Sequence, residues 1–211
     1  MIFLEVLTEG SSDVPAVKEI LTRRFNLKEN EHFRIHPHRG KGKLPSNPLS
    51  RPHPSRRGLL DQLPAKLRGY SYLPADYCVV VLVDSDSEDC KELKKSLVEV
   101  YKQLDKRPKC ILFRIAVEET ESWFLADADA IQAAYQRAKV TKIAGLAPDS
   151  IIGAWEKLAE VLGRRPQECD GGDKLEWAST IAPHLDLEQP KSPSLNAFVT
   201  GVKRLISARG V

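Results

Sequence analysis

The stretch CVVVLVDSD, residues 78–86, decides the fold of this chain. Its first six residues form a continuous apolar run, which is typical of a β-strand covered on both faces. Asp84 and Asp86 follow at the point where that strand must end. A strand that is covered on both faces lies inside a layered protein, so the run predicts a parallel or mostly parallel sheet flanked by helices.

The segments around this run alternate between strand and helix patterns. Residues 2–8 form an apolar, β-branched strand that stops at Glu9-Gly10, and a helix with Pro15 in its first turn follows. Residues 33–38 and 110–117 offer two further strands, while residues 56–68 and 91–104 carry apolar side chains at helical spacing. Strands that alternate with helices predict crossover connections within a parallel sheet.

After Glu119 the patterns are helical, over residues 122–138, 150–162, 174–185 and 194–208. A chain of 211 residues is long enough for one large domain or for a domain with an appendage. We therefore expect an α/β core over residues 1–125, which includes a basic, Pro-rich loop at 39–57. A helical C-terminal extension over residues 126–211 would pack on that core.

The overall composition excludes several classes of protein. There are 32 Lys and Arg residues against 29 Asp and Glu residues, and the net charge of +3 taken alone predicts no affinity for nucleic acid or membrane. The longest apolar run is far shorter than the roughly 20 residues that span a bilayer. The N-terminus lacks the features of a signal peptide, so we expect a cytoplasmic protein. The four cysteines form no C-x-x-C pair, and we expect reduced, mostly buried thiols.

The balanced total conceals a strong separation of charge. Between Glu31 and Asp61 the chain has no acidic residue but seven Lys or Arg residues, and four prolines interrupt regular structure within residues 39–55. Such a segment suits contact with phosphate groups, although a solvated loop is the alternative interpretation. We favour anion binding, and the candidate nucleic-acid contacts are Arg39, Lys41, Lys43, Arg51, Arg56 and Arg57.

Acidic residues gather directly after three of the predicted strands. Because the carboxyl ends of parallel strands meet at one edge of a sheet, we expect these carboxylates to converge. Crowded carboxylates repel one another unless a cation lies among them, which predicts a hard divalent ion, Mg²⁺ or Mn²⁺. Glu118 and Glu121 would share one face of a helix, whereas Glu88 and Asp89 are better explained as helix caps. The candidate metal ligands are Glu9, Asp84, Asp86, Glu118 and Glu121, and the first three are also the candidate catalytic residues.

These motifs resemble a known class of domain. A strand ending in Glu9-Gly10 and a strand ending in Asp84-Ser85-Asp86 are similar to the TOPRIM domain of topoisomerases, bacterial primases and OLD-family nucleases. With the segments 39–44, 118–124, 174–184 and 192–194, the chain is similar to the bacterial domain-of-unknown-function 4276 family. The resemblance implies a TOPRIM-like (Rossmann-like) fold, a general acid/base or metal-binding role for Glu9, and metal binding by Asp84 and Asp86. It also implies a AAA-type ATPase encoded nearby and a setting of phage defence.

Three functions fit the sequence. The first is a Mg²⁺-dependent phosphodiesterase, a nuclease, that acts on DNA or RNA. The second is a non-catalytic TOPRIM-fold module that binds nucleic acid or an ATPase partner, and the third is an enzyme that acts on a small phosphate compound. The chain has no G-x-x-x-x-G-K-[ST] loop, so nucleotide hydrolysis by this chain alone is not expected. The sequence leaves the choice between DNA and RNA and the oligomeric state open.

Overall fold

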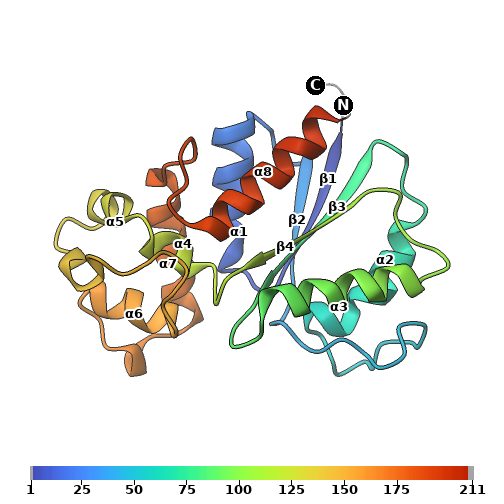
Figure 1. Ribbon diagram of the computed structural model, residues 1–211, viewed down its shortest axis with the longest axis horizontal. Helices are drawn as coiled ribbons and strands as arrows, with labels where there is room; N and C mark the ends of the chain where they lie inside the picture. Colours follow the sequence, from blue (N-terminus) through green and yellow to red (C-terminus); the bar gives the residue numbers. More distant parts are fainter. Residues whose placement is uncertain (1, 209–211) are drawn as a thin grey trace.

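The structure, a computed structural model, describes residues 2–208 and is built around a parallel four-stranded sheet in the order β2-β1-β3-β4 (Figure 1). The central strands are β1 (Phe3–Thr8) and β3 (Tyr77–Asp84), and both are buried along nearly their whole length. The outer strands are β2 (Phe33–Pro37) and β4 (Ile111–Ala116). The predicted parallel α/β fold is confirmed.

Helices cover both faces of the sheet, because successive side chains of the central strands point to opposite sides. On β3, Val80 and Leu82 contribute to one apolar core, while Val79 and Val81 contribute to the other. The first core is closed by α1 (Asp13–Glu19), which continues as a π-helical turn, and by α8 (Pro193–Ser207). The second is closed by α2 (Leu59–Tyr70) and α3 (Cys90–Gln103).

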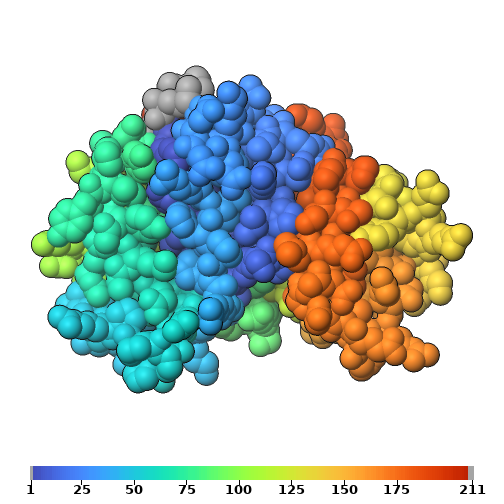
Figure 2. Space-filling model, turned by 180° about the vertical axis from the view of Figure 1, so that it is seen from behind, coloured from blue at the N-terminus to red at the C-terminus, as the bar shows by residue number. Residues whose placement is uncertain are grey.

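The chain after β4 is helical and packs on the first core. Its helices are α4 (Glu121–Leu125), α5 (Ala128–Ala134), α6 (Ala154–Val161), α7 (Gly171–Ile181) and α8, joined by short 3₁₀ turns. Trp123 and Trp177 are fully buried in that shared core. Figure 2 shows α7, in orange, against the N-terminal segment in blue, in agreement with the contact between α1 and α7. The expected division between residues 125 and 126 stays a prediction.

Two helix boundaries differ from the sequence pattern because of side-chain caps. The predicted helix over residues 122–138 is divided, since the Asp127 carboxylate accepts a hydrogen bond from Ala130 N and starts α5. The sequence of residues 169–173 favours a turn. Instead, Asp170 and Asp173 form a capping box that begins α7 there. Both differences come from local hydrogen bonds that the apolar period does not record.

The expectation of reduced thiols is wrong for one pair of cysteines. Cys78, in β3, forms a disulfide with Cys110, which directly precedes β4, while Cys90 and Cys169 are free. The two bonded cysteines come directly before Val79 and Ile111, the first pair of the β3–β4 ladder. Their separation of 32 residues gives no sign of this contact in the sequence. None of the helices within residues 2–208 is long and apolar enough to cross a membrane.

Candidate functional site

The carboxyl ends of β1, β3 and β4 meet at one edge of the sheet. Glu9 follows β1, and its Oε1 accepts a hydrogen bond of 2.8 Å from the backbone N–H of Asp84, the last residue of β3. The loop after β3 is tied to the loop after β4, because Asp86 N donates to Glu118 O at 2.9 Å. The structure therefore brings Glu9, Asp84 and Asp86 to the same edge.

Asp13 is a further member of this group, which the sequence-based prediction of the site leaves out. It opens α1 and is buried, with only 4% of its surface exposed. Its Oδ2 accepts a hydrogen bond from Gly10 N at 3.0 Å, and its Oδ1 accepts one from Thr120 Oγ1 at 2.9 Å. Asp13 thus links the loop after β1 to the segment that precedes α4. The acidic run after β1 is visible in the sequence, but capping of α1 accounts for it equally well.

Burial raises the pKa of three carboxylates at this edge, and repulsion between carboxylates adds to the effect at Glu9 and Asp84. Burial, with added repulsion from Asp13 and Asp86, raises the pKa of Glu9 to about 8. Burial and the charges of Asp13 and Glu9 raise the pKa of Asp84 well above its usual range. Burial also raises the pKa of Asp13. The three carboxyl groups are not all ionised at neutral pH unless a cation binds among them.

Lys174 reaches the same edge from α7. Its Nζ lies 3.2 Å from Glu121 Oε1 and 3.3 Å from Glu119 Oε1, and it sits over the ring of Trp155 at 5.7 Å. Burial and the charge of Glu121 raise the pKa of Glu119 to about 7. Burial lowers the pKa of Lys174, but Glu121 and Glu119 outweigh it and raise that pKa above its usual value. The sequence marks Lys174 only as part of Lys174-x-x-Trp177 and gives it no role.

Glu118 lies at the same edge but turns towards α6. Its backbone is left-handed, with φ of 65°, and α4 begins three residues later at Glu121. The helical face that Glu118 and Glu121 were expected to share therefore does not form. Instead, the Glu118 carboxylate accepts hydrogen bonds of 3.0 Å from both Gly153 N and Ala154 N. This contact caps α6, as expected for a carboxylate at a helix N-terminus.

Lys41 lies inside the carboxylate group and not on the open surface. Its Nζ is 2.9 Å from Asp86 Oδ2, 2.8 Å from Glu88 Oε1 and 3.1 Å from Ser85 O. Burial lowers the pKa of Lys41, but hydrogen bonds to Glu88 and Asp86 outweigh it and raise that pKa. Asp89 caps α3 as expected, by accepting from Lys91 N and Glu92 N. Glu88 instead pairs with Lys41.

The basic loop, residues 39–57, is anchored at the carboxylate edge. Gly40 N donates to Glu9 O at 2.8 Å, and Arg39 N donates to Arg57 O at 3.3 Å across the base of the loop. Gly42 and Gly58 also meet there, since a Cβ added at Gly58 would lie 2.5 Å from the backbone of Gly42. Only glycine allows this approach, and Gly42 has a φ of +68°.

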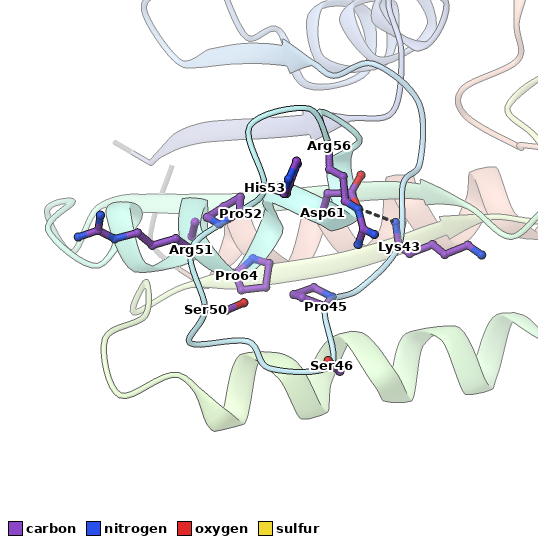
Figure 3. Close-up of a pocket in the computed structure, with 11 residues that line it drawn as sticks. Lys43, Pro45, Ser46, Ser50, Arg51, Pro52, His53, Arg56, Asp61 and Pro64 are labelled. Atoms are coloured by element: carbon purple, nitrogen blue, oxygen red, sulfur yellow. Dashed lines mark hydrogen bonds between the residues drawn. The ribbon is translucent and has the colours of Figure 1, made fainter.

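The loop lines a small cavity, and two of its basic side chains extend away from it. Figure 3 shows this cavity, of about 210 Å³, with Arg51 and Lys43 extending from it in opposite directions. Lys43 N donates to Asp61 Oδ1 at 3.3 Å, which ties the loop to α2. Among residues 2–208, five of the six predicted nucleic-acid contacts are exposed and form no ion pair, namely Arg39, Lys43, Arg51, Arg56 and Arg57. The sixth, Lys41, is engaged as described above.

The donor chemistry at this edge suits a hard divalent cation, because all the acidic ligands offer carboxylate oxygens. Within residues 2–208, however, no three His, Cys, Asp or Glu side chains stand close enough together to form a metal-binding group as they are. The metal-ligand assignment of Glu9, Asp84, Asp86, Glu118 and Glu121 therefore stays a prediction.

The parallel α/β sheet, with acidic side chains behind its central strands, agrees with the TOPRIM-like fold that the sequence motifs imply. In agreement, the fold matches the C-terminal region of the Burkholderia pseudomallei OLD protein with a TM-score of 0.55. The match covers 96% of this chain and 98% of that one at 10% sequence identity, so it establishes the fold alone. The model of the family described as "Domain of unknown function (DUF4276)" matches residues 8–203, and the chain belongs to that family. No curated protein matches the sequence.

Proposed function

We propose that this chain is a divalent-metal-dependent phosphodiesterase that cleaves DNA or RNA. The observation that carries the proposal is the crowding of Glu9, Asp13 and Asp84 at one sheet edge, directly beside the anchored basic loop. Buried and half-buried carboxylates with raised pKa values are typical of functional sites. Unpaired cations next to them are suited to holding the phosphates of a polyanion.

The proposal assigns a role to the residues at the carboxyl ends of the strands and to those at the base of the basic loop. Glu9, Asp84 and Asp86 would hold Mg²⁺ or Mn²⁺, which when bound supplies Lewis-acid stabilisation of charge on a phosphoryl oxygen. Arg39 and Arg57 would position the substrate backbone from the base of the loop. In the alternative in which Asp84 and Asp86 hold the metal without Glu9, the Glu9 carboxyl group, whose pKa of about 8 lies near physiological pH, is suited to accept or release a proton.

The ATPase partner and the setting of phage defence belong to the proposal as well. Their support is the family resemblance of the motifs, since the fold match says nothing about partners. A AAA-type ATPase encoded near this chain would be tested by co-expression and co-purification. Recovery of this chain alone, with the ATPase soluble in the same extract, would remove that part of the proposal.

The main test is metal-dependent cleavage by the purified chain. Single- and double-stranded DNA and RNA are incubated with Mg²⁺, Mn²⁺ or EDTA, and the products are separated on denaturing gels. We expect cleavage with either metal and none in EDTA. Asp84→Asn and Glu9→Gln should reduce cleavage to background, whereas Glu99→Gln, an exposed carboxylate on α3, should leave it unchanged.

Two results would contradict the proposal. Undiminished cleavage by folded Glu9→Gln and Asp84→Asn variants would show that the activity does not come from this edge. Nucleic-acid binding by the wild-type chain without cleavage under any metal would favour the non-catalytic binding module instead. Circular dichroism of each variant separates loss of activity from loss of folding.

A further inference from the structure

A second cationic surface lies beside β4, the outer strand at the other end of the sheet from β2, after which the basic loop begins. It is a groove of about 750 Å³ along β4, with α3 on one side and α8 on the other, as the arrangement in Figure 1 shows. Four cations line it, and we call them the groove cations: Lys91 and Lys94 of α3, Arg114 of β4, and Arg204 of α8.

The groove cations have no acidic partner within residues 2–208, unlike Lys41 and Lys174. Asp149 is the one carboxylate in the lining, and its two oxygens are already occupied. Its Oδ1 accepts a hydrogen bond from Ser192 Oγ at 2.7 Å, and its Oδ2 accepts one from Ser194 N at 2.7 Å. Asp149 therefore holds the N-terminus of α8, and the four groove cations outnumber this one carboxylate in the lining.

Arg114 is fixed in place by the structure around it. Its Nε donates to Ala197 O at 2.7 Å, and its Nη1 donates to Phe113 O at 2.8 Å. The guanidinium packs against Gly201, where a Cβ would lie 2.5 Å from Arg114 Cζ. Burial and the charge of Arg204 both lower the pKa of Arg114. A partly buried guanidinium that faces another cation is unfavourable by itself and becomes favourable when an anion bridges the two.

The exposed edge of β4 adds hydrogen-bond donors to this groove. Val79 N donates to Cys110 O, and Ser85 N donates to Ala116 O. These two bonds show which residues of β4 direct their backbone groups towards β3 and which direct them away from it. In a parallel ladder the amide groups of Phe113 and Ile115 then point away from β3. The Arg114 side chain donates to the carbonyl oxygen of Phe113 and so occupies an acceptor that another strand would need. The edge of β4 therefore offers N–H donors but does not favour pairing with another strand.

The groove begins at the carboxylate edge. Val117 lines it and directly precedes Glu118, and Cys90 lines it and directly follows Asp89. The basic loop begins after β2 and the groove runs beside β4, and these are the two outer strands of the sheet. The carboxylates behind β1 and β3 therefore lie between the start of the loop and the groove. A polymer with its reacting phosphate at the carboxylates has cations on both sides.

We propose that one nucleic-acid strand runs from the carboxylate edge into the groove along β4, with its phosphates on the groove cations. The inference rests on the proposed function for the class of substrate, and it adds where the strand runs. A phosphate backbone fits better than an acidic protein segment, because the cations occupy both walls and Arg114 blocks strand addition.

The test is binding of a fluorescent single-stranded oligothymidylate in EDTA, measured by anisotropy over a range of salt concentrations. The groove variant is Lys94→Glu with Arg204→Glu, and both residues are exposed. The control is Lys95→Glu with Lys203→Glu, which makes the same charge change on the same two helices outside the groove. We expect the groove variant to bind the oligonucleotide at least about tenfold more weakly than wild type. The slope of log affinity against log salt concentration should be smaller by about 1.4, because two phosphate contacts are lost at about 0.7 each. The control should stay within about twofold of wild type.

Each other outcome has a definite meaning. Equal affinity of the groove and control variants, or no binding by the wild-type chain at low salt, overturns the inference. Competition by polyglutamate as strong as that by unlabelled oligothymidylate would assign the groove to an acidic protein segment and also overturns it. Groove-dependent binding without metal-dependent cleavage supports the inference while the proposed function fails. Cleavage with unchanged binding by the groove variant supports the proposed function while the inference fails.

Discussion

Replacing Glu9 with Gln tests whether carboxylate repulsion at the sheet edge weakens the folded chain. Glu9→Gln keeps an oxygen that can accept the hydrogen bond from Asp84 N and removes the charge. The pKa of Glu9 rises from 4.5 to about 8, chiefly through burial, with Asp13 and Asp86 adding repulsion. The folded state therefore holds this proton to a higher pH than the unfolded state does. As a result, the wild-type chain loses stability as the pH rises from about 4.5 to about 8.

The size of the effect follows from that shift. At about 1.4 kcal/mol per pKa unit, the rise in the pKa of Glu9 can lower the free energy of unfolding by at most about 5 kcal/mol, and this maximum is reached above pH 8. The Glu9 carboxyl group keeps some contact with solvent, which lowers the expected gain for Glu9→Gln to about 2 kcal/mol. For a chain of this length that corresponds to roughly 4–8 °C in Tm.

The assay is urea unfolding in EDTA at pH 5 and at pH 9, with Glu99→Gln as the control. Glu9→Gln should unfold with nearly the wild-type free energy at pH 5 and should be about 2 kcal/mol more stable at pH 9. Addition of Mn²⁺ should stabilise the wild-type chain more than the variant, since the variant lacks one proposed ligand. A variant that is less stable than wild type at pH 9, or equally shifted at both pH values, would refute this reasoning.

Three more outcomes are expected. Lys174→Met should destabilise the chain by about 2–3 kcal/mol at pH 8, because Glu121 stays buried without a cation. The loss should be smaller at pH 5, where Glu119 is protonated. An equal loss of unfolding free energy in urea at both pH values would contradict this expectation. Gly201→Ala should lower the free energy of unfolding by about 1–3 kcal/mol through its clash with Arg114, measured by thermal unfolding. The control is Gly69→Ala, which has open space within α2 and should be neutral or stabilising by up to about 1 kcal/mol. Without reductant, the unfolded chain should show reactive thiols at Cys90 and Cys169, with Cys78 and Cys110 reacting only after reduction; reaction of all four at once would exclude the disulfide.

The strands could be predicted from the sequence because their burial is recorded in the residues themselves. The run at residues 78–83 lies inside β3, and the strand expected at residues 2–8 is observed as Phe3–Thr8. Helix starts were less predictable, since single side chains decide them. The carboxylates of Asp127 and Asp170 begin α5 and α7 within segments whose patterns indicate continuous helix and turn, respectively.

The candidate site divides in the same way. Glu9 and Asp84 could be placed together because the carboxyl ends of adjacent parallel strands meet by topology alone. Lys174 could not be placed, because its approach depends on how α7 packs against α1. Glu118 could not be oriented either, since its φ of 65° turns its carboxylate towards α6. Contacts that follow from strand order are readable in the sequence, and contacts that follow from helix packing are not.

The positions of two half-buried lysines show which carboxylates remain without an ion pair. Lys41 pairs with Asp86 and Glu88, and Lys174 pairs with Glu119 and Glu121. Within residues 2–208, Glu9, Asp13 and Asp84 have no ion pair, and burial raises the pKa of each.

Folding alone does not favour such an arrangement, because buried and half-buried carboxylates destabilise a chain that apolar residues would stabilise. The three sit where the central strands end, between the basic loop and the groove along β4. A divalent cation at that point would relieve the repulsion that the two lysines leave. The same unpaired charge that weakens the metal-free fold is therefore the strongest physical reason to expect a metal-dependent site there.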